Sequence, residues 1–122
     1  ENFHYKDIVY ENNTILIKTR NSNGAAGKVE ARGFMLFSDP LVTNVLVRHN
    51  FVQTIAEDLY SNASSIVVQG YNEYQPDAPI IYRDNILVSN YNILRFGDSY
   101  GVGSNALFID NYLTTFDDIN II

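Results

Sequence analysis

The sequence predicts an all-β parallel β-helix, a solenoid in which the chain winds through about four coils. Three observations support this prediction. Four gapless segments share an apolar strand with an asparagine at the sixth position: residues 8–15, 45–52, 80–87 and 106–113. Further strand-like segments alternate with these: residues 34–39, 66–71, 93–98 and 119–122. Frequent asparagine and 13% aromatic residues, with few Lys and Glu, favour strands and turns over helices.

The repeated asparagines are Asn13, Asn50, Asn85 and Asn111. An inward-pointing asparagine at a bend can hydrogen-bond the backbone of its own turn, adopt the left-handed conformation there, and stack its amide on the asparagine of the next coil. One asparagine would only mark a turn. Four at an aligned position predict an asparagine ladder that satisfies buried polar groups coil by coil.

The coils differ in length, because the intervals between the asparagines are 37, 35 and 26 residues. Residues 21–33, 57–65 and 72–79 are rich in Gly, Asn, Ser, Pro or charge, so we predict loops there. The length and the 46% apolar content predict one domain over residues 1–122. With no capping helix in the pattern, we expect a segment of a longer solenoid or a stacking subunit.

This repeat resembles the right-handed parallel β-helix superfamily with the pectate-lyase-like fold. That superfamily includes polysaccharide lyases, polygalacturonases, uronan epimerases, phage tailspikes and surface adhesins. The resemblance covers residues 8–122 and implies a right-handed solenoid. It implies no particular activity, because the repeats of a solenoid reflect only the stacking of its coils.

Strand alternation predicts which apolar residues line the core if the ladder asparagines point inward. The predicted core positions are Ile8, Tyr10, Ile15, Val45, Val47, Val52, Ile80, Tyr82, Leu87, Ala106, Phe108 and Leu113. The same alternation turns an outer stripe away from the core: Val9, Leu46, Ile81, Leu107, Thr14, Phe51, Ile86 and Tyr112. An apolar stripe needs a cover. Either the inserted loops fold over it, or it forms an interface with another subunit or another part of a longer protein.

Charged and polar residues occupy the two positions just before the ladder asparagines: Arg48, His49, Arg83, Asp84 and Asp110. We predict that they stack at about 4.8 Å per coil into a row that could bind an acidic sugar or hold a cation. Tyr71, Tyr74, Tyr91 and Tyr100 lie in or beside the predicted loops and could stack on sugar rings. The alternative is that Asp, Asn and His simply favour turns, and that Arg beside carboxylates forms ordinary solvated ion pairs.

The sequence offers few residues suited to binding nucleic acid or metal, to crossing a membrane or to the catalytic motifs of this superfamily. The net charge of −6 argues against nucleic acid, and no apolar run approaches the roughly 20 residues of a membrane span. There are no cysteines and only two histidines, so we predict no metal site or cofactor. A Ca²⁺ site would need more oxygen ligands than Asp84 and Asp110. The G-H-G and R-I-K strings of a polygalacturonase-like site and the D-P-H string of a uronan-epimerase-like site do not occur.

The favoured hypothesis is an extracellular, cell-surface or virion-associated β-helix module that recognises polysaccharide and is itself more suited to binding than to catalysis. A structural subunit of a fibre or adhesin shaft is the alternative. A third hypothesis is a fragment of a polysaccharide lyase or glycoside hydrolase. The expected protein partners are further copies or further coils of the same protein. The N-x-[ST] sequons at Asn12 and Asn62 are candidate glycosylation sites.

Overall fold

The computed structural model describes residues 5–21, 29–38, 42–58, 61–70, 79–96 and 106–115, and every regular element in these ranges is a β-strand. The all-β class predicted from the sequence is therefore confirmed. The strands are β1 (Tyr5–Glu11), β2 (Thr14–Thr19), β3 (Val29–Ser38), β4 (Val42–Arg48), β5 (Phe51–Ala56), β6 (Ser61–Gly70), β7 (Ile80–Arg83), β8 (Ile86–Ser89), β9 (Asn92–Phe96), β10 (Ala106–Ile109) and β11 (Tyr112–Thr115).

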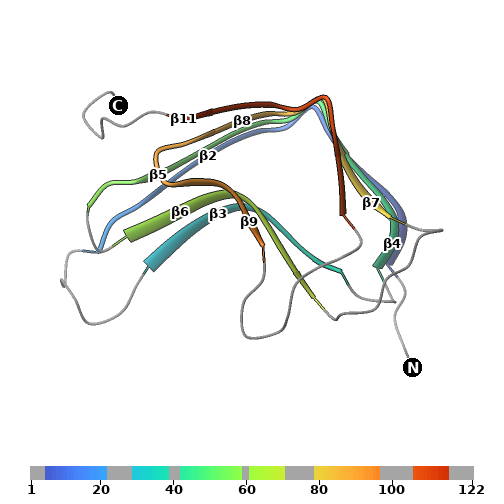
Figure 1. Ribbon diagram of the computed structural model, residues 1–122, viewed down its shortest axis with the longest axis horizontal. Coiled ribbons are helices and arrows are strands. Elements are labelled where there is room, and N and C mark those ends of the chain that lie inside the picture. Colours follow the sequence, from blue (N-terminus) through green and yellow to red (C-terminus); the bar gives the residue numbers. More distant parts are fainter. Residues whose placement is uncertain are drawn as a thin grey trace.

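The strands form three sheets in which all pairing is parallel. Sheet A has the order β1-β4-β7-β10, sheet B the order β2-β5-β8-β11, and sheet C the order β3-β6-β9. In Figure 1, sheet B lies along the top, β4 and β7 of sheet A lie at the right, and sheet C lies below sheet B. Every third strand thus joins the same sheet, an arrangement compatible with a parallel solenoid.

The strand register agrees with the alignment of the four repeated segments. In sheet A, Glu11 is paired with Arg48 and Arg48 with Arg83. In sheet B, Thr14 is paired with Phe51, and the same position continues through β8 to β11. Equivalent positions of the repeat are therefore neighbours in space.

Parts of two segments predicted as loops are strand instead. β3 begins at Val29 and β6 at Ser61, so residues 29–33 and 61–65 extend sheet C. The small residues that suggested loops are instead packed in the interior, since Ala31, Ala63 and Ser65 are buried. The predicted strands at 34–39, 66–71 and 93–98 lie within or overlap β3, β6 and β9, whereas residues 119–122 and the predicted loop at 72–78 fall outside the described ranges.

Gly33 shows why this part of sheet C uses small residues. A Cβ atom at Gly33 would lie 2.3 Å from Val52 Cγ1 and 2.5 Å from the backbone oxygen of Ser65. Real Cβ atoms do not approach other atoms this closely, so sheets B and C meet here with no room for a side chain. Gly33 belongs to a tight contact between sheets and not to a loop.

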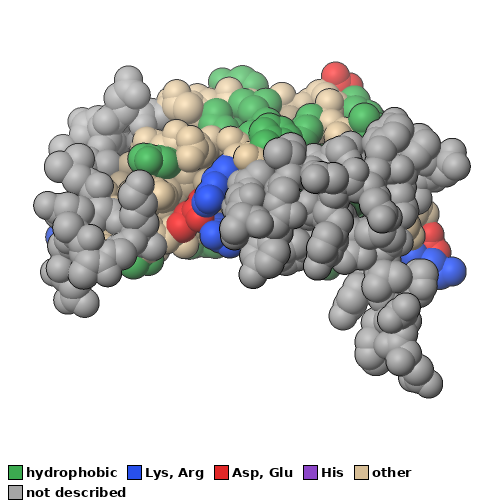
Figure 2. Space-filling view, turned by 60° about the horizontal axis from the view of Figure 1, so that its bottom comes forward, with side chains coloured by type: hydrophobic (Ala, Val, Ile, Leu, Met, Phe, Trp, Pro, Cys, Tyr) green, Lys and Arg blue, Asp and Glu red, His purple; other side chains and the backbone are tan. Residues whose placement is uncertain are grey.

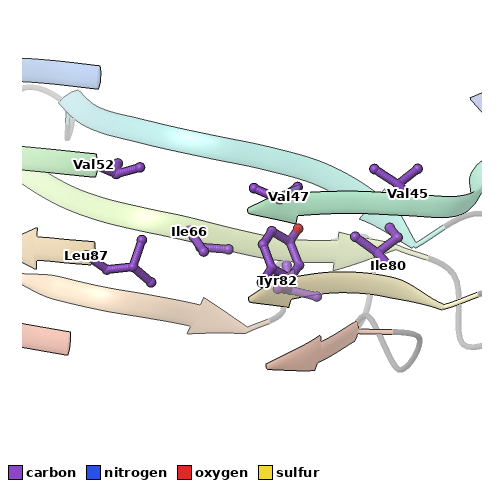
Figure 3. Close-up of a cluster of buried hydrophobic side chains, with 8 residues drawn as sticks. Val45, Val47, Val52, Ile66, Ile80, Tyr82 and Leu87 are labelled. Atoms are coloured by element: carbon purple, nitrogen blue, oxygen red, sulfur yellow. The ribbon is translucent and has the colours of Figure 1, made fainter. Parts of the chain in front are cut away.

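We use the word coil for each of the four repeated segments together with the strands that follow it. The core lies between the three sheets, where the predicted residues of the second and third coils are fully buried (Figure 3). These are Val45, Val47, Val52, Ile80, Tyr82 and Leu87, joined by Ile66 and Val68 of β6. Tyr82 stacks on Phe108, with ring centroids 4.8 Å apart and planes 7° from parallel. Burial raises the pKa of the Tyr82 hydroxyl.

Equivalent residues of the first and last coils point the same way but stay partly exposed. Ile8, Ile15, Ala106 and Phe108 pack against the core, whereas Tyr10 is 37% exposed and Leu113 is 43% exposed. Within the described part of the chain, these residues have a neighbouring coil on one side.

The outer stripe faces outward as predicted. Val9, Leu107, Ile86 and Tyr112 are exposed, and Leu46, Ile81 and Phe51 are half-buried. No described part of the chain covers these four exposed side chains. No described segment forms a helix long and apolar enough to cross a membrane.

Candidate functional site

The candidate site is the corner where sheets A and B meet, which we call the asparagine corner. Hydrogen bonds join its four asparagines in chain order. The backbone N–H and the side-chain Nδ2 of Asn13 both donate to Asn50 Oδ1 at 3.0 Å. Asn50 donates in the same way to Asn85 Oδ1, at 3.0 and 3.0 Å, and Asn85 to Asn111 Oδ1, at 3.0 and 2.9 Å.

Each later asparagine also donates to a backbone carbonyl of the preceding coil, and not to the backbone of its own turn as predicted. The carbonyl oxygens of Tyr10, Val47 and Tyr82 accept from Nδ2 of Asn50, Asn85 and Asn111 at 3.0, 3.0 and 2.9 Å, respectively. Asn50 and Asn85 are buried, so these bonds replace the water that the amides lose on folding. The amides form an asparagine ladder that ties each coil to the next.

The residue before each ladder asparagine, and not the asparagine itself, adopts the left-handed conformation. Asn12, His49, Asp84 and Asp110 have φ angles of 58°, 53°, 53° and 51°. The prediction that the ladder asparagines tolerate this conformation therefore named the wrong residue of the turn. Asn, Asp and His are the residue types most enriched at positive φ, so the backbone alone gives a reason for them at this position.

The predicted charged row is brought together along the corner. We use this name for Glu11, Arg48, His49, Arg83, Asp84 and Asp110. Arg48 Nε lies 2.8 Å from Glu11 Oε2 of the preceding coil, and Arg83 Nε lies 2.8 Å from Asp84 Oδ2 of its own coil. The hydrogen bond to Asp84 raises the pKa of Arg83. Both pairs are exposed enough that water or a ligand can compete for them.

Apolar side chains border the charged row on sheet B. Phe51, Ile86 and Tyr112 occupy successive coils directly after the ladder, and Tyr112 is 65% exposed. The corner can therefore present donors, acceptors and an apolar surface side by side. Of the tyrosines predicted to stack on sugars, Tyr91 is exposed just before β9, whereas Tyr71, Tyr74 and Tyr100 lie outside the described ranges.

A second charged cluster lies on sheet C around Glu30, a residue that sequence reasoning missed. Glu30 accepts hydrogen bonds from Arg95 Nη1 at 2.5 Å, Arg32 Nε at 2.9 Å and Ser64 Oγ at 2.9 Å. Burial raises the pKa of the Glu30 carboxyl, but these three hydrogen bonds outweigh it and hold the pKa below its ordinary value of 4.5. Glu30 was hidden because its segment was predicted as a loop. In Figure 2, acidic side chains (red) and basic side chains (blue) of described residues lie next to each other.

The described residues contain no group of three or more His, Asp or Glu side chains placed to hold a metal ion. Of the two sequons, Asn12 is exposed at the turn, whereas Asn62 is half-buried within β6. Glycosylation at either residue stays a prediction. Comparison of the chain with protein-family models, curated proteins and solved structures gave no match.

Proposed function

We propose that this chain is a segment of a right-handed parallel β-helix of the pectate-lyase-like type, and that it recognises polysaccharide through the outer face of the asparagine corner. An extracellular, cell-surface or virion-associated location is part of this proposal. The parallel sheets and the ladder support the fold. The observation that carries the function is the exposed charged row lying beside the apolar positions of Phe51, Ile86 and Tyr112.

Sugar chemistry fits this combination of groups. Sugar hydroxyls both donate and accept hydrogen bonds, and the row offers guanidinium donors next to carboxylate acceptors. The apolar face of a sugar ring can rest on an exposed aromatic ring such as Tyr112. Because the row contains two arginines against three carboxylates, we expect a neutral, hydroxyl-rich polysaccharide to bind better than a polyanion.

The test is a glycan screen with the intact chain and two matched variants. Arg83→Ala removes a guanidinium from the row, and Arg20→Ala removes one from an exposed position outside it. We expect Arg83→Ala to weaken binding of a neutral polysaccharide by several-fold and Arg20→Ala to leave it unchanged.

Absence of binding to every neutral and acidic polysaccharide would overturn the proposal, as would equal losses in the two variants. Release of unsaturated or reducing ends from a bound polysaccharide would instead favour the lyase or glycosidase hypothesis.

A further inference from the structure

The asparagine ladder has a direction, and its two ends differ chemically. Asn50, Asn85 and Asn111 each accept two hydrogen bonds at Oδ1 from the preceding coil. Among the described residues, no group donates to Asn13 Oδ1, and the backbone N–H of Asn111 donates to no acceptor. The first coil thus ends in an acceptor and the last coil in a donor.

Core-facing side chains are also open at both ends. Tyr10 of the first coil and Leu113 of the last are 37% and 43% exposed, whereas their counterparts Tyr82 and Leu87 are fully buried. Among the described strands, β1 and β2 have no strand paired on their outer edge, and neither do β10 and β11. Exposed parallel edges of this kind are templates for pairing with another chain.

We propose that a second copy of this chain stacks head to tail, its first coil covering the last coil of the copy before it. This contact is separate from the polysaccharide face and does not depend on it. It extends sheet A by pairing β10 with β1 of the second copy, and sheet B by pairing β11 with β2. The donors at Asn111 then meet the acceptor at Asn13, so the ladder runs on with its spacing unchanged.

Side chains favour this orientation when the observed register is carried across the contact. Phe108 would lie against Tyr10 of the second copy, in the way that it stacks on Tyr82 within the chain. Ile109 would lie next to Glu11, so no like charges meet there. Head-to-head contact would instead bring two acceptor ends together. A head-to-tail contact uses two different surfaces and leaves one of each free, so it produces filaments rather than closed dimers.

Sedimentation of the intact chain over a concentration series tests the contact, with two variants that each close one end. Leu113→Lys places a charge on the last coil and Tyr10→Lys places one on the first. Both positions are exposed in the single chain, so the charge is buried only in the stack. Leu16→Lys is the matched control. Leu16 is also exposed, at 64%, but its side chain points outward from β2 and not toward the core.

We expect the unmodified chain and Leu16→Lys to grow with concentration, and each end variant alone to stay a monomer. An equal mixture of Leu113→Lys and Tyr10→Lys should give a dimer of twice the monomer mass, because each retains the end that the other has lost. Circular dichroism shows whether each variant keeps its strand content.

Three results would overturn the proposal. One is a monomer at every concentration for the unmodified chain. Another is assembly that Leu16→Lys abolishes and Leu113→Lys does not, which would indicate contact through the outer stripe. The third is an equal mixture of folded end variants that remains monomeric.

Discussion

The asparagine corner and the junction between sheets B and C solve the same problem in different ways. Both places must pair buried polar groups where the chain passes from one sheet to the next. At the corner, one residue type at one position makes the same hydrogen bonds in successive coils. At the junction, each coil uses different residues.

Asn90 is an example of pairing at the junction that depends on one particular residue. β8 ends at Ser89, whereas its neighbour β5 continues to Ala56. The Asn90 side chain fills the missing place, since its Oδ1 accepts from Ala56 N–H at 2.8 Å and its Nδ2 donates to Ala56 O at 2.7 Å. An amide side chain thus substitutes for one residue of a strand.

Hydroxyl groups at the junction are less completely paired than the amides at the corner. Thr54 and Ser65 hydroxyls lie 3.3 Å apart, and Ser65 also donates to Val88 O at 3.0 Å. The buried hydroxyls of Thr19 and Ser61 have no hydrogen-bond partner in the described part of the chain. Repetition therefore gives the two inner amides of the corner, Asn50 and Asn85, a partner for each donor and acceptor, which the hydroxyl groups of the irregular junction lack.

The largest effect is expected from Asn85→Leu at the centre of the ladder. This change removes the Oδ1 that accepts from the N–H and Nδ2 of Asn50, and the Nδ2 that donates to Val47 O. Buried groups left unpaired cost about 1–3 kcal/mol each, so we expect a loss of about 3–5 kcal/mol in the free energy of unfolding, measured with urea.

Asn13→Leu is the control at the exposed end of the ladder. Water can replace its hydrogen bonds, so the expected loss is about 1 kcal/mol or less. Equal losses in the two variants would show that ladder position does not matter and would contradict the account of the corner.

A smaller loss is expected from Gly33→Ala at the junction. The added Cβ would meet Val52 Cγ1 at 2.3 Å and the backbone oxygen of Ser65 at 2.5 Å, and the backbone oxygen cannot rotate away. Overpacking of this kind costs about 1–3 kcal/mol, which urea unfolding would detect. Arg32→Ala, at the exposed neighbouring residue, should cost less. A Gly33→Ala variant as stable as the unmodified chain would mean that the sheets can separate here.

These differences explain what the sequence could predict. The corner repeats one residue at one position, so the strands around it, the inward face and the stacked charged row could be predicted from an alignment of the chain with itself. The partners of the charges could not: Arg48 pairs across coils and Arg83 within its own coil, a choice that depends on side-chain conformation. The first residues of β3 and β6 were mistaken for loops, because small residues suit loops and tight sheet contacts equally well.

Hydrogen exchange measured by NMR can show whether a directional ladder of buried amides joins the coils. The backbone N–H groups of Asn50 and Asn85 donate to the next asparagine, whereas that of Asn111 has no acceptor among the described residues. At concentrations where the chain is a monomer, we predict slow exchange at Asn50 and Asn85, close to the limit set by global unfolding, and fast exchange at Asn111. Exchange at Asn50 and Asn85 as fast as at Asn111 would contradict the ladder.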